Sequence, residues 1–136
     1  MILIDTGPLV ALCHPVDSHH RKSMRQLEAF APGDLATCEA MLVEAWFHLP
    51  RDIQRDRLRA LLEDQDIAVL PGAADRAFRD EVFDWLQKYA DHVPDWTDGC
   101  IAVLSGRDHT LKVWTYDGEF YTIWRRPDGT RIPLAV

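Results

Sequence analysis

The sequence predicts an α/β fold of three layers, with helices on both faces of a mostly parallel sheet of four to five strands. Short apolar runs alternate with longer amphipathic segments along the 136-residue chain. This alternation is typical of βαβ units, whose parallel strands are buried on both faces and therefore read as continuous apolar runs. No repeat, linker or low-complexity stretch divides the chain, so we expect residues 1–136 to form one domain.

Four apolar runs are expected to form the strands. They cover residues 1–4, 35–38, 67–70 and 111–116. Thr6-Gly7-Pro8 breaks the first run, and Pro71-Gly72 closes the third. The tail is predicted to add a strand at residues 120–124, then a turn at Pro127-Asp128-Gly129 and a terminal edge segment.

The segments between these runs carry apolar residues at helical spacing. They cover residues 9–12, 18–31, 39–49, 52–63, 74–90 and 97–105. Ser18 is a suitable N-cap, and the following helix is expected to turn Met24 and Leu27 inward. In the 39–49 helix, Leu42 and Trp46 are among the residues expected to face the core.

The composition restricts the classes of function. With 15 Lys and Arg against 22 Asp and Glu, the formal net charge is −7, so the chain lacks the basic footprint of most nucleic-acid-binding proteins. An acidic chain still accommodates an RNA substrate if a bound divalent cation or a basic partner offsets the local charge.

No long uncharged apolar stretch predicts a membrane span, and Met1–Ile4 meets Asp5 too soon for a signal peptide, which favours a cytoplasmic protein. The three cysteines show no C-x-x-C spacing and are expected to be reduced core residues.

Four acidic residues are placed where this fold brings them to one edge. Asp5 and Asp117 each follow a predicted strand, while Glu44 and Asp98 interrupt the apolar side of predicted helices. Ligands of parallel sheets bind beyond the carboxyl ends of the strands. Because a carboxylate is costly to bury without a cation, the pattern predicts a divalent-metal site.

Each acid also has an ordinary structural interpretation. Asp5 is a common turn residue, Glu44 can point to solvent, and a carboxylate in the first turn of a helix, such as Asp98, is favoured by the helix dipole. Asp117 precedes Gly118, which is a hairpin-turn signal. Against this, Asp98 begins a stripe of residues at i, i+3, i+4 and i+7 that is expected to be buried. Near these acids, Asp95 is a further rim acid or an N-cap, and Thr115 shares one side of its strand with Asp117.

Several hydrolase classes are disfavoured by missing residues. The six histidines form no H-E-x-x-H pair, which argues against a zinc hydrolase. A haloacid-dehalogenase-type phosphatase needs a second Asp two positions after the first, where this chain has Gly7. Asp5-Thr6-Gly7 matches the triplet of aspartic proteases, but those enzymes are all-β proteins.

Taken in order, the acidic motifs resemble those of PIN-domain ribonucleases, especially the toxin half of VapBC-type toxin–antitoxin pairs. The matching stretches are Ile4–Leu12, Asp17-x-x-His20, Leu42–Ala45, Asp95–Leu104 and Thr115-x-Asp117-x-x-Phe120. The chain departs from the family pattern at Gly99, Cys100 and Gly118, and none of these departures removes a carboxylate.

The resemblance implies a metal-dependent endoribonuclease with a PIN-like fold, acting as a toxin with a small antitoxin partner and forming a homodimer. It implies that Asp5, Glu44, Asp98 and Asp117 hold Mg²⁺ or Mn²⁺, with Thr6, Asp95 and Thr115 in support. The RNA-contacting surface is expected among Arg107, Lys112, Arg125, Arg126 and Arg131, although these are also ordinary solvated residues. The alternatives are a non-catalytic PIN-like module inhibited by a basic peptide and, less favoured, the phosphatase.

Overall fold

The sheet at the centre of the molecule has four strands, all parallel. The computed structural model describes residues 1–136 and contains β1 (Ile2–Ile4), β2 (Leu35–Cys38), β3 (Ala68–Leu70) and β4 (Lys112–Trp114). The spatial order is β3-β2-β1-β4, so β1 is paired on both sides, with Leu3 opposite Ala36 and Val113. This confirms the predicted fold class and the parallel sheet.

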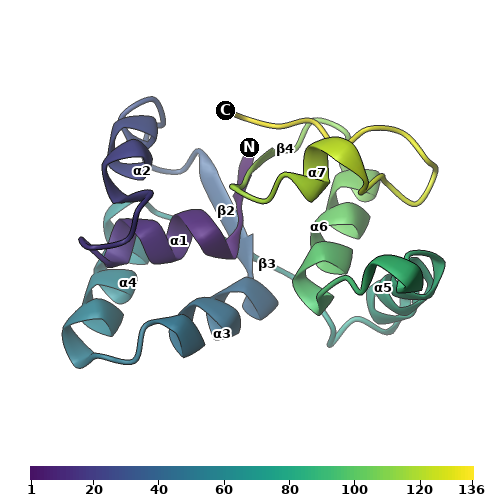
Figure 1. The fold of residues 1–136 in the computed structure, drawn as a ribbon, viewed down its shortest axis with the longest axis horizontal. Helices are drawn as coiled ribbons and strands as arrows, with labels where there is room; N and C mark the ends of the chain where they lie inside the picture. The colour runs from purple at the N-terminus through teal and green to yellow at the C-terminus, as the bar shows by residue number, and fades with distance from the viewer.

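Helices cover both faces of this sheet. The helices are α1 (Thr6–Cys13), α2 (His20–Leu27), α3 (Glu39–His48), α4 (Asp52–Asp64), α5 (Arg76–Lys88), α6 (Trp96–Arg107) and α7 (Glu119–Thr122), with a 3-10 turn at Ala90–His92. Figure 1 shows α1, α2 and α4 on the left of the strands, α3 below them and α5 to α7 on the right. None of these helices combines the length and the apolar character needed to cross a bilayer.

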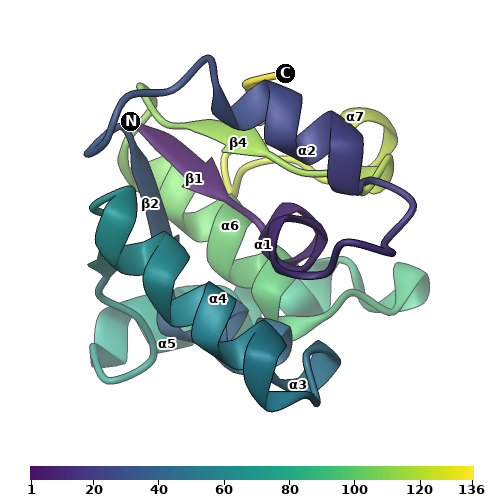
Figure 2. The same cartoon turned by 90° about the vertical axis from the view of Figure 1, so that its left-hand side faces the viewer.

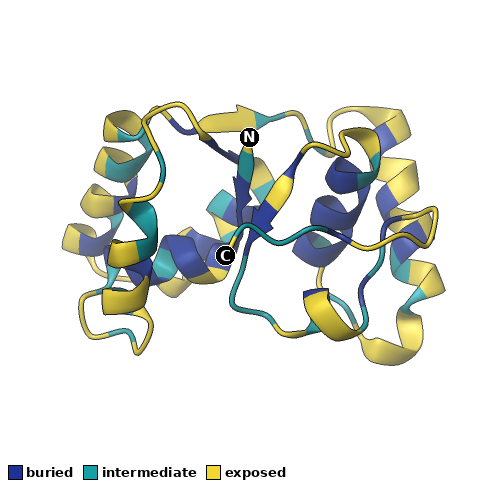
Figure 3. Ribbon diagram, turned by 90° about the horizontal axis from the view of Figure 1, so that it is seen from above, coloured by how far each residue is buried: buried dark blue, intermediate teal, exposed yellow.

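The core is one continuous cluster of 26 buried residues that the sheet shares with both helical layers. Figure 3 shows the buried segments along the strands and on the inward sides of the helices. Nine consecutive residues of α6, Thr97–Ser105, are buried, which makes this helix part of the interior. A Cβ at Gly99 would lie 2.9 Å from Val82 Cγ1, so the close contact between α5 and α6 requires glycine there.

The tail differs from the prediction, because residues 119–122 form α7 where a strand was expected at 120–124. Phe120 and Trp124 are both buried while Tyr121 is exposed, which is the i, i+4 pattern of a helical turn. The β-prone composition of this segment had suggested alternation instead. The terminal segment does lie at the sheet edge, where Leu134 forms a parallel bridge with Val113.

Two predicted helix faces are wrong in part, although Ala45 and Leu49 do face the core as expected. The helix α2 begins at His20 with His19 at its N-cap position, so Ser18 lies outside it, and Met24 is 44% exposed. In α3, Trp46 is 51% exposed, and the Arg55 guanidinium stacks on its ring at 3.9 Å. Met41, Ala45 and Leu49, at a spacing of four residues, are the ones that face the core.

Candidate active site

Asp5 is held at the carboxyl end of β1 by contacts to two neighbouring segments. Its backbone N–H donates to the Trp114 carbonyl of β4 at 2.9 Å. Its side chain caps α1, because Oδ1 accepts the Thr6 N–H at 2.7 Å. The residue is 8% exposed, so its carboxylate is fixed and mostly removed from water.

Thr115, which follows β4, supports Asp5 rather than Asp117. Its hydroxyl donates to Asp5 Oδ2 at 2.7 Å and accepts the Asp117 N–H at 3.0 Å. The sequence predicted that Thr115 and Asp117 share one side of a strand, but the chain leaves the strand at Trp114. The hydroxyl therefore links the first acid to the backbone of the fourth.

Asp98 lies in the first turn of α6 and also caps it. Its Oδ2 accepts the Asp95 N–H at 2.8 Å, and Asp95 is the N-cap residue, as one of the two interpretations proposed. Asp98 is 8% exposed, and the stripe that it begins is buried. The helix N-terminus and this hydrogen bond favour the carboxylate, while burial opposes it.

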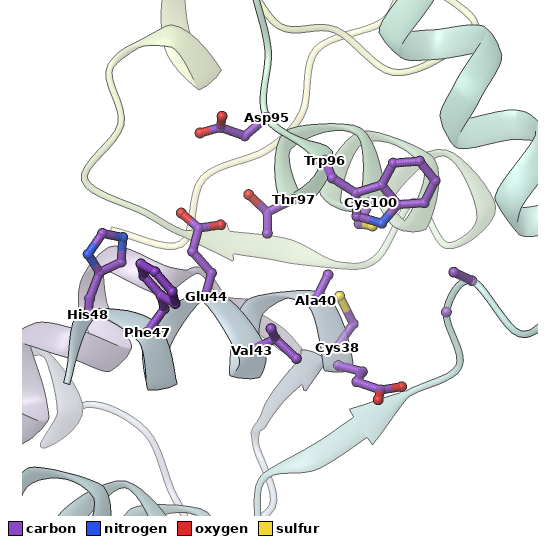
Figure 4. A pocket seen from close by; sticks show the side chains of 13 residues that line it. Cys38, Ala40, Val43, Glu44, Phe47, His48, Asp95, Trp96, Thr97 and Cys100 are labelled. Atoms are coloured by element: carbon purple, nitrogen blue, oxygen red, sulfur yellow. The ribbon is translucent and has the colours of Figure 1, made fainter. Parts of the chain in front are cut away.

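Glu44 and Asp117 are only half-buried. The Asp117 Oδ1 accepts the Glu119 N–H at 2.9 Å, so this acid holds the turn before α7, and no hairpin forms there. In Figure 4 the Glu44 carboxylate extends from α3 toward Thr97 and Asp95 at the start of α6. Glu44 therefore points into the space between the helices, not to bulk solvent.

All four acids line one cavity of about 520 Å³. Asp17, Asp95 and the buried Thr6 line it too, and an apolar cavity of about 880 Å³ between α3 and α6 adjoins it (Figure 4). No lysine or arginine lines either cavity. The negative charge of the acids is therefore not offset by a lysine or arginine in the lining.

This crowding changes the protonation of Asp5. Burial is the main reason that the pKa of Asp5 rises to about 6, and the nearby charges of Glu44 and Asp117 raise it further. The hydrogen bonds from Thr115 and Thr6 act in the opposite direction, because they favour the charged form.

Asp98 is shifted in the same direction. Burial raises the pKa of Asp98 to about 7, against the hydrogen bond from the Asp95 N–H, and the charges of Asp117, Asp5 and Asp95 add to the rise. Two carboxyl groups that titrate near neutrality in one cavity are a common property of functional sites.

The side chains fit a hard divalent cation in chemistry. Carboxylate oxygens are the ligands that Mg²⁺ and Mn²⁺ prefer, and the buried Thr6 hydroxyl has no hydrogen-bond partner beside them. No three of the acidic side chains converge closely enough to form a finished coordination sphere. Glu44, with its flexible side chain, is the acid best able to move toward the others.

The basic residues expected to contact RNA do not line the cavity. Arg126 is buried and bonded inside the fold, and Arg107 donates to Glu81 from both Nε and Nη2 at 3.2 Å. Lys112 begins β4, so it lies at the amino ends of the parallel strands, whereas Asp5 lies at their carboxyl ends. The sequence interpretation was therefore wrong for Arg126, which was expected to lie on the surface and contact RNA.

Four titratable residues that sequence reasoning did not select also line the cavity. They are His14, His19, His48 and Tyr116. His14 Nδ1 lies 2.9 Å from Nε2 of the buried Gln54, while His20 of the Asp17-x-x-His20 motif turns away to the Ala11 carbonyl at 2.7 Å. Tyr116 lies between Thr115 and Asp117, and that adjacency was the only signal available.

Comparisons with known proteins agree with this arrangement. The sequence matches the PIN domain family over residues 2–124. Among solved structures, the fold is similar to the crystal structure of Mycobacterium tuberculosis VapC20, described as a sarcin-ricin loop cleaving toxin. That similarity has a TM-score of 0.75 at 18% sequence identity and covers 90% of this chain and 94% of that chain. No curated protein sequence matches the chain.

Proposed function

Since the chain belongs to the PIN-domain family, we propose that it is a metal-dependent endoribonuclease that hydrolyses RNA phosphodiester bonds. The observation that carries the proposal is the pair of buried carboxyl groups, Asp5 and Asp98, in a cavity with four further acids and no lysine or arginine. Such a group of carboxylates is costly unless a cation binds it.

In this proposal the carboxylates hold Mg²⁺ or Mn²⁺. Asp5 and Asp98 are the direct ligands, Glu44 binds the cation or acts through water as a base, and Asp117 completes the site. A divalent cation supplies Lewis-acid activation of water and neutralises charge at the phosphate when it is bound. Cation binding also keeps Asp5 and Asp98 ionised at neutral pH, because it lowers the pKa of each carboxyl.

The supporting residues keep the acids in place. The hydrogen bond from Thr115 fixes the orientation of the Asp5 carboxylate. The hydrogen bond from the Asp95 N–H does the same for Asp98. The Thr6 hydroxyl is free to hydrogen-bond a water in the cavity. These contacts fix the two direct ligands before any cation arrives, which reduces the entropic cost of binding.

We further propose that the protein is a cytoplasmic toxin with a small antitoxin partner, and that it forms a homodimer. The structural similarity to a toxin supports this assignment. The apolar cavity beside the acids, with Phe47 81% exposed and Val43 exposed on α3, offers a surface that a protein partner can cover. An antitoxin bound there would lie next to Glu44.

The test is cleavage of RNA by the purified protein. Cleavage is expected with Mn²⁺ or Mg²⁺, and both EDTA and Asp98→Asn are expected to abolish it. Asp56→Asn is the matched control, because Asp56 is exposed on α4 and lines neither cavity. Cleavage that needs no metal, or that survives the loss of Asp98, contradicts the proposed mechanism.

A further inference from the structure

The helix α2 carries basic residues that no acidic residue of the same helix balances. The segment His20–Leu27 reads HRKSMRQL and contains no acidic residue. Its three cations, Arg21, Lys22 and Arg25, are all exposed, and none of them forms an ion pair. By contrast, Arg107, one of the basic residues expected from the sequence, is neutralised by Glu81 and Asp75. The α2 cations therefore remain available to an external anion.

This helix lies against the end of β4 that leads into the cavity. Gln26 Oε1 accepts two hydrogen bonds, from the Trp114 indole N–H at 3.0 Å and from the Tyr116 hydroxyl at 2.6 Å. Lys22 Nζ lies 5.0 Å from the centre of the Tyr116 ring. Figure 2 shows α2 in front of β4 and above α1. Tyr116 contacts α2 and also lines the acidic cavity, so it connects the two.

Two stacked aromatic rings, those of His19 and Tyr116, lie between α2 and the cavity. The rings of His19 and Tyr116 are 4.5 Å apart with an angle of 24° between their planes. His19 is exposed and also lines the cavity, and its backbone N–H donates to Asp17 Oδ1 at 2.8 Å. Both rings are thus positioned before any ligand binds, Tyr116 by Gln26 and His19 by the turn at Asp17.

Free cations beside an exposed aromatic ring match the chemistry of single-stranded RNA. Aromatic and histidine side chains stack on unpaired bases, while lysine and arginine contact the phosphates. A base in a double helix is covered on both faces by its neighbours and has no face free for His19. A rigid platform also lowers the entropic cost of ordering a flexible strand.

We propose that His19, Tyr116 and the cations of α2, together called the α2 platform, bind single-stranded RNA next to the cleavage site. An unpaired base stacks on the exposed face of His19, and the flanking phosphates contact Lys22, Arg21 and Arg25. The inference rests on the proposed ribonuclease function and adds the substrate class and the side from which the strand enters. It also explains how a chain of net charge −7 attracts RNA without lysine or arginine in the cavity.

Binding of a short labelled single-stranded RNA tests the platform, measured by fluorescence anisotropy. The measurement uses full-length protein in an Asp98→Asn background, where the RNA stays intact. His19→Ala is expected to weaken binding about tenfold, the usual effect of removing one base stack. His19→Phe retains a ring without the nitrogens, so it is expected to restore the affinity. Weak binding by both variants overturns the stacking role.

The cations are tested by the salt dependence of the same binding. The combined change of Arg21, Lys22 and Arg25 to Ala is expected to reduce the slope of log Kd against log salt by about 0.7 for each phosphate that the variant no longer neutralises. Arg79→Ala is the control, because Arg79 is exposed on α5 in the other helical layer. An unchanged slope in the triple variant, or an equal change in the control, overturns the proposal.

Cleavage of the same RNA by protein that retains Asp98 separates this inference from the proposed function. If the RNA is cleaved but neither His19→Ala nor the triple variant slows cleavage at low RNA concentration, the platform is wrong and the ribonuclease assignment stands. If no cleavage occurs while RNA binding still depends on His19, the ribonuclease assignment fails and the platform stands. The expected result is cleavage whose KM rises in both variants while kcat changes little.

Discussion

Two regions of this molecule bury charged side chains, and they treat the charge in opposite ways. At the tail, the Arg126 guanidinium is 7% exposed. It donates to the Ser105 hydroxyl at 2.9 Å, to the Thr130 hydroxyl at 3.3 Å and to the His109 carbonyl at 3.4 Å. These neutral acceptors tie the end of α6 to the tail, and Arg126 lines neither cavity.

At the carboxyl edge of the sheet, Asp5 and Asp98 are buried to the same degree but line an open cavity. Each has local hydrogen bonds, yet burial and, to a lesser degree, nearby acids raise its pKa, and no lysine or arginine lines the cavity. A buried charged group such as Arg126, whose hydrogen bonds are all made within the protein, stabilises the fold. Buried charges that lower the stability of the fold are typical of ligand-binding sites, and we propose that these acids bind a cation.

The largest effect is expected at Asp5. Asp5→Asn removes a proposed metal ligand while the amide oxygen can still accept the Thr6 N–H, so RNA cleavage is expected to fall by at least about 10²-fold with the fold intact. A cleavage assay with thermal melting of the same sample checks both parts. Asp5→Asn protein that melts far below the native protein contradicts the comparison, because Asp5 would then be a brace like Arg126.

Arg126 is expected to behave in the reverse manner. Arg126→Met keeps the apolar length but leaves the Ser105 hydroxyl and the His109 carbonyl without their donor, so unfolding free energy is expected to fall by about 3 kcal/mol. Urea unfolding measures this loss. Cleavage per folded molecule is expected to stay near the native value, and a selective loss of kcat would refute the structural role.

The dependence of stability on pH separates the two regions further. Because the pKa values of Asp5 and Asp98 rise to about 6 and about 7 from an unfolded value of 3.8, the folded state holds more protons between about pH 4 and pH 7. Stability without metal is therefore expected to decrease as the pH rises through this window. Asp98→Asn is expected to flatten the profile, whereas Arg126→Met lowers it without changing its slope.

The smallest effect is expected at Thr115. Thr115→Val keeps the shape but removes the donor to Asp5 Oδ2, which raises the pKa of Asp5 further and weakens its hold on a cation. Cleavage is expected to fall about tenfold, with the acidic limb of the pH–rate profile moved to higher pH. Thr110→Val, remote from the cavity, is the matched control. A rate that falls equally at every pH would show that Thr115 acts only on the fold.

The fold and the edge of the sheet were predictable from local pattern. Short apolar runs alternating with helices define the parallel sheet, and Asp5 follows the first run directly, so its place at the carboxyl edge follows from chain direction. The burial of Asp98 was predictable from its stripe on α6. Neither inference needed a tertiary contact.

The remainder depended on contacts between distant segments. Thr115 was paired with its neighbour in sequence, but its hydroxyl meets Asp5 from 110 residues away. The cations of α2 are visible in the sequence, yet only the packing of Gln26 against Tyr116 places them beside the cavity. Arg126 looked like a surface residue because nothing local reveals that the Ser105 hydroxyl of α6 accepts its hydrogen bond. The tail helix was missed because the composition of residues 121–123 outweighed the i, i+4 spacing of two aromatics.

The central claim is that the buried carboxylates form one cation site, and calorimetric titration of the protein with Mn²⁺ tests it most directly. The native protein is expected to bind Mn²⁺ in a saturable manner, with Asp56→Asn unchanged and with binding lost in Asp5→Asn and in Asp98→Asn. Native affinity in both of these variants, or no binding by the native protein, would contradict the account.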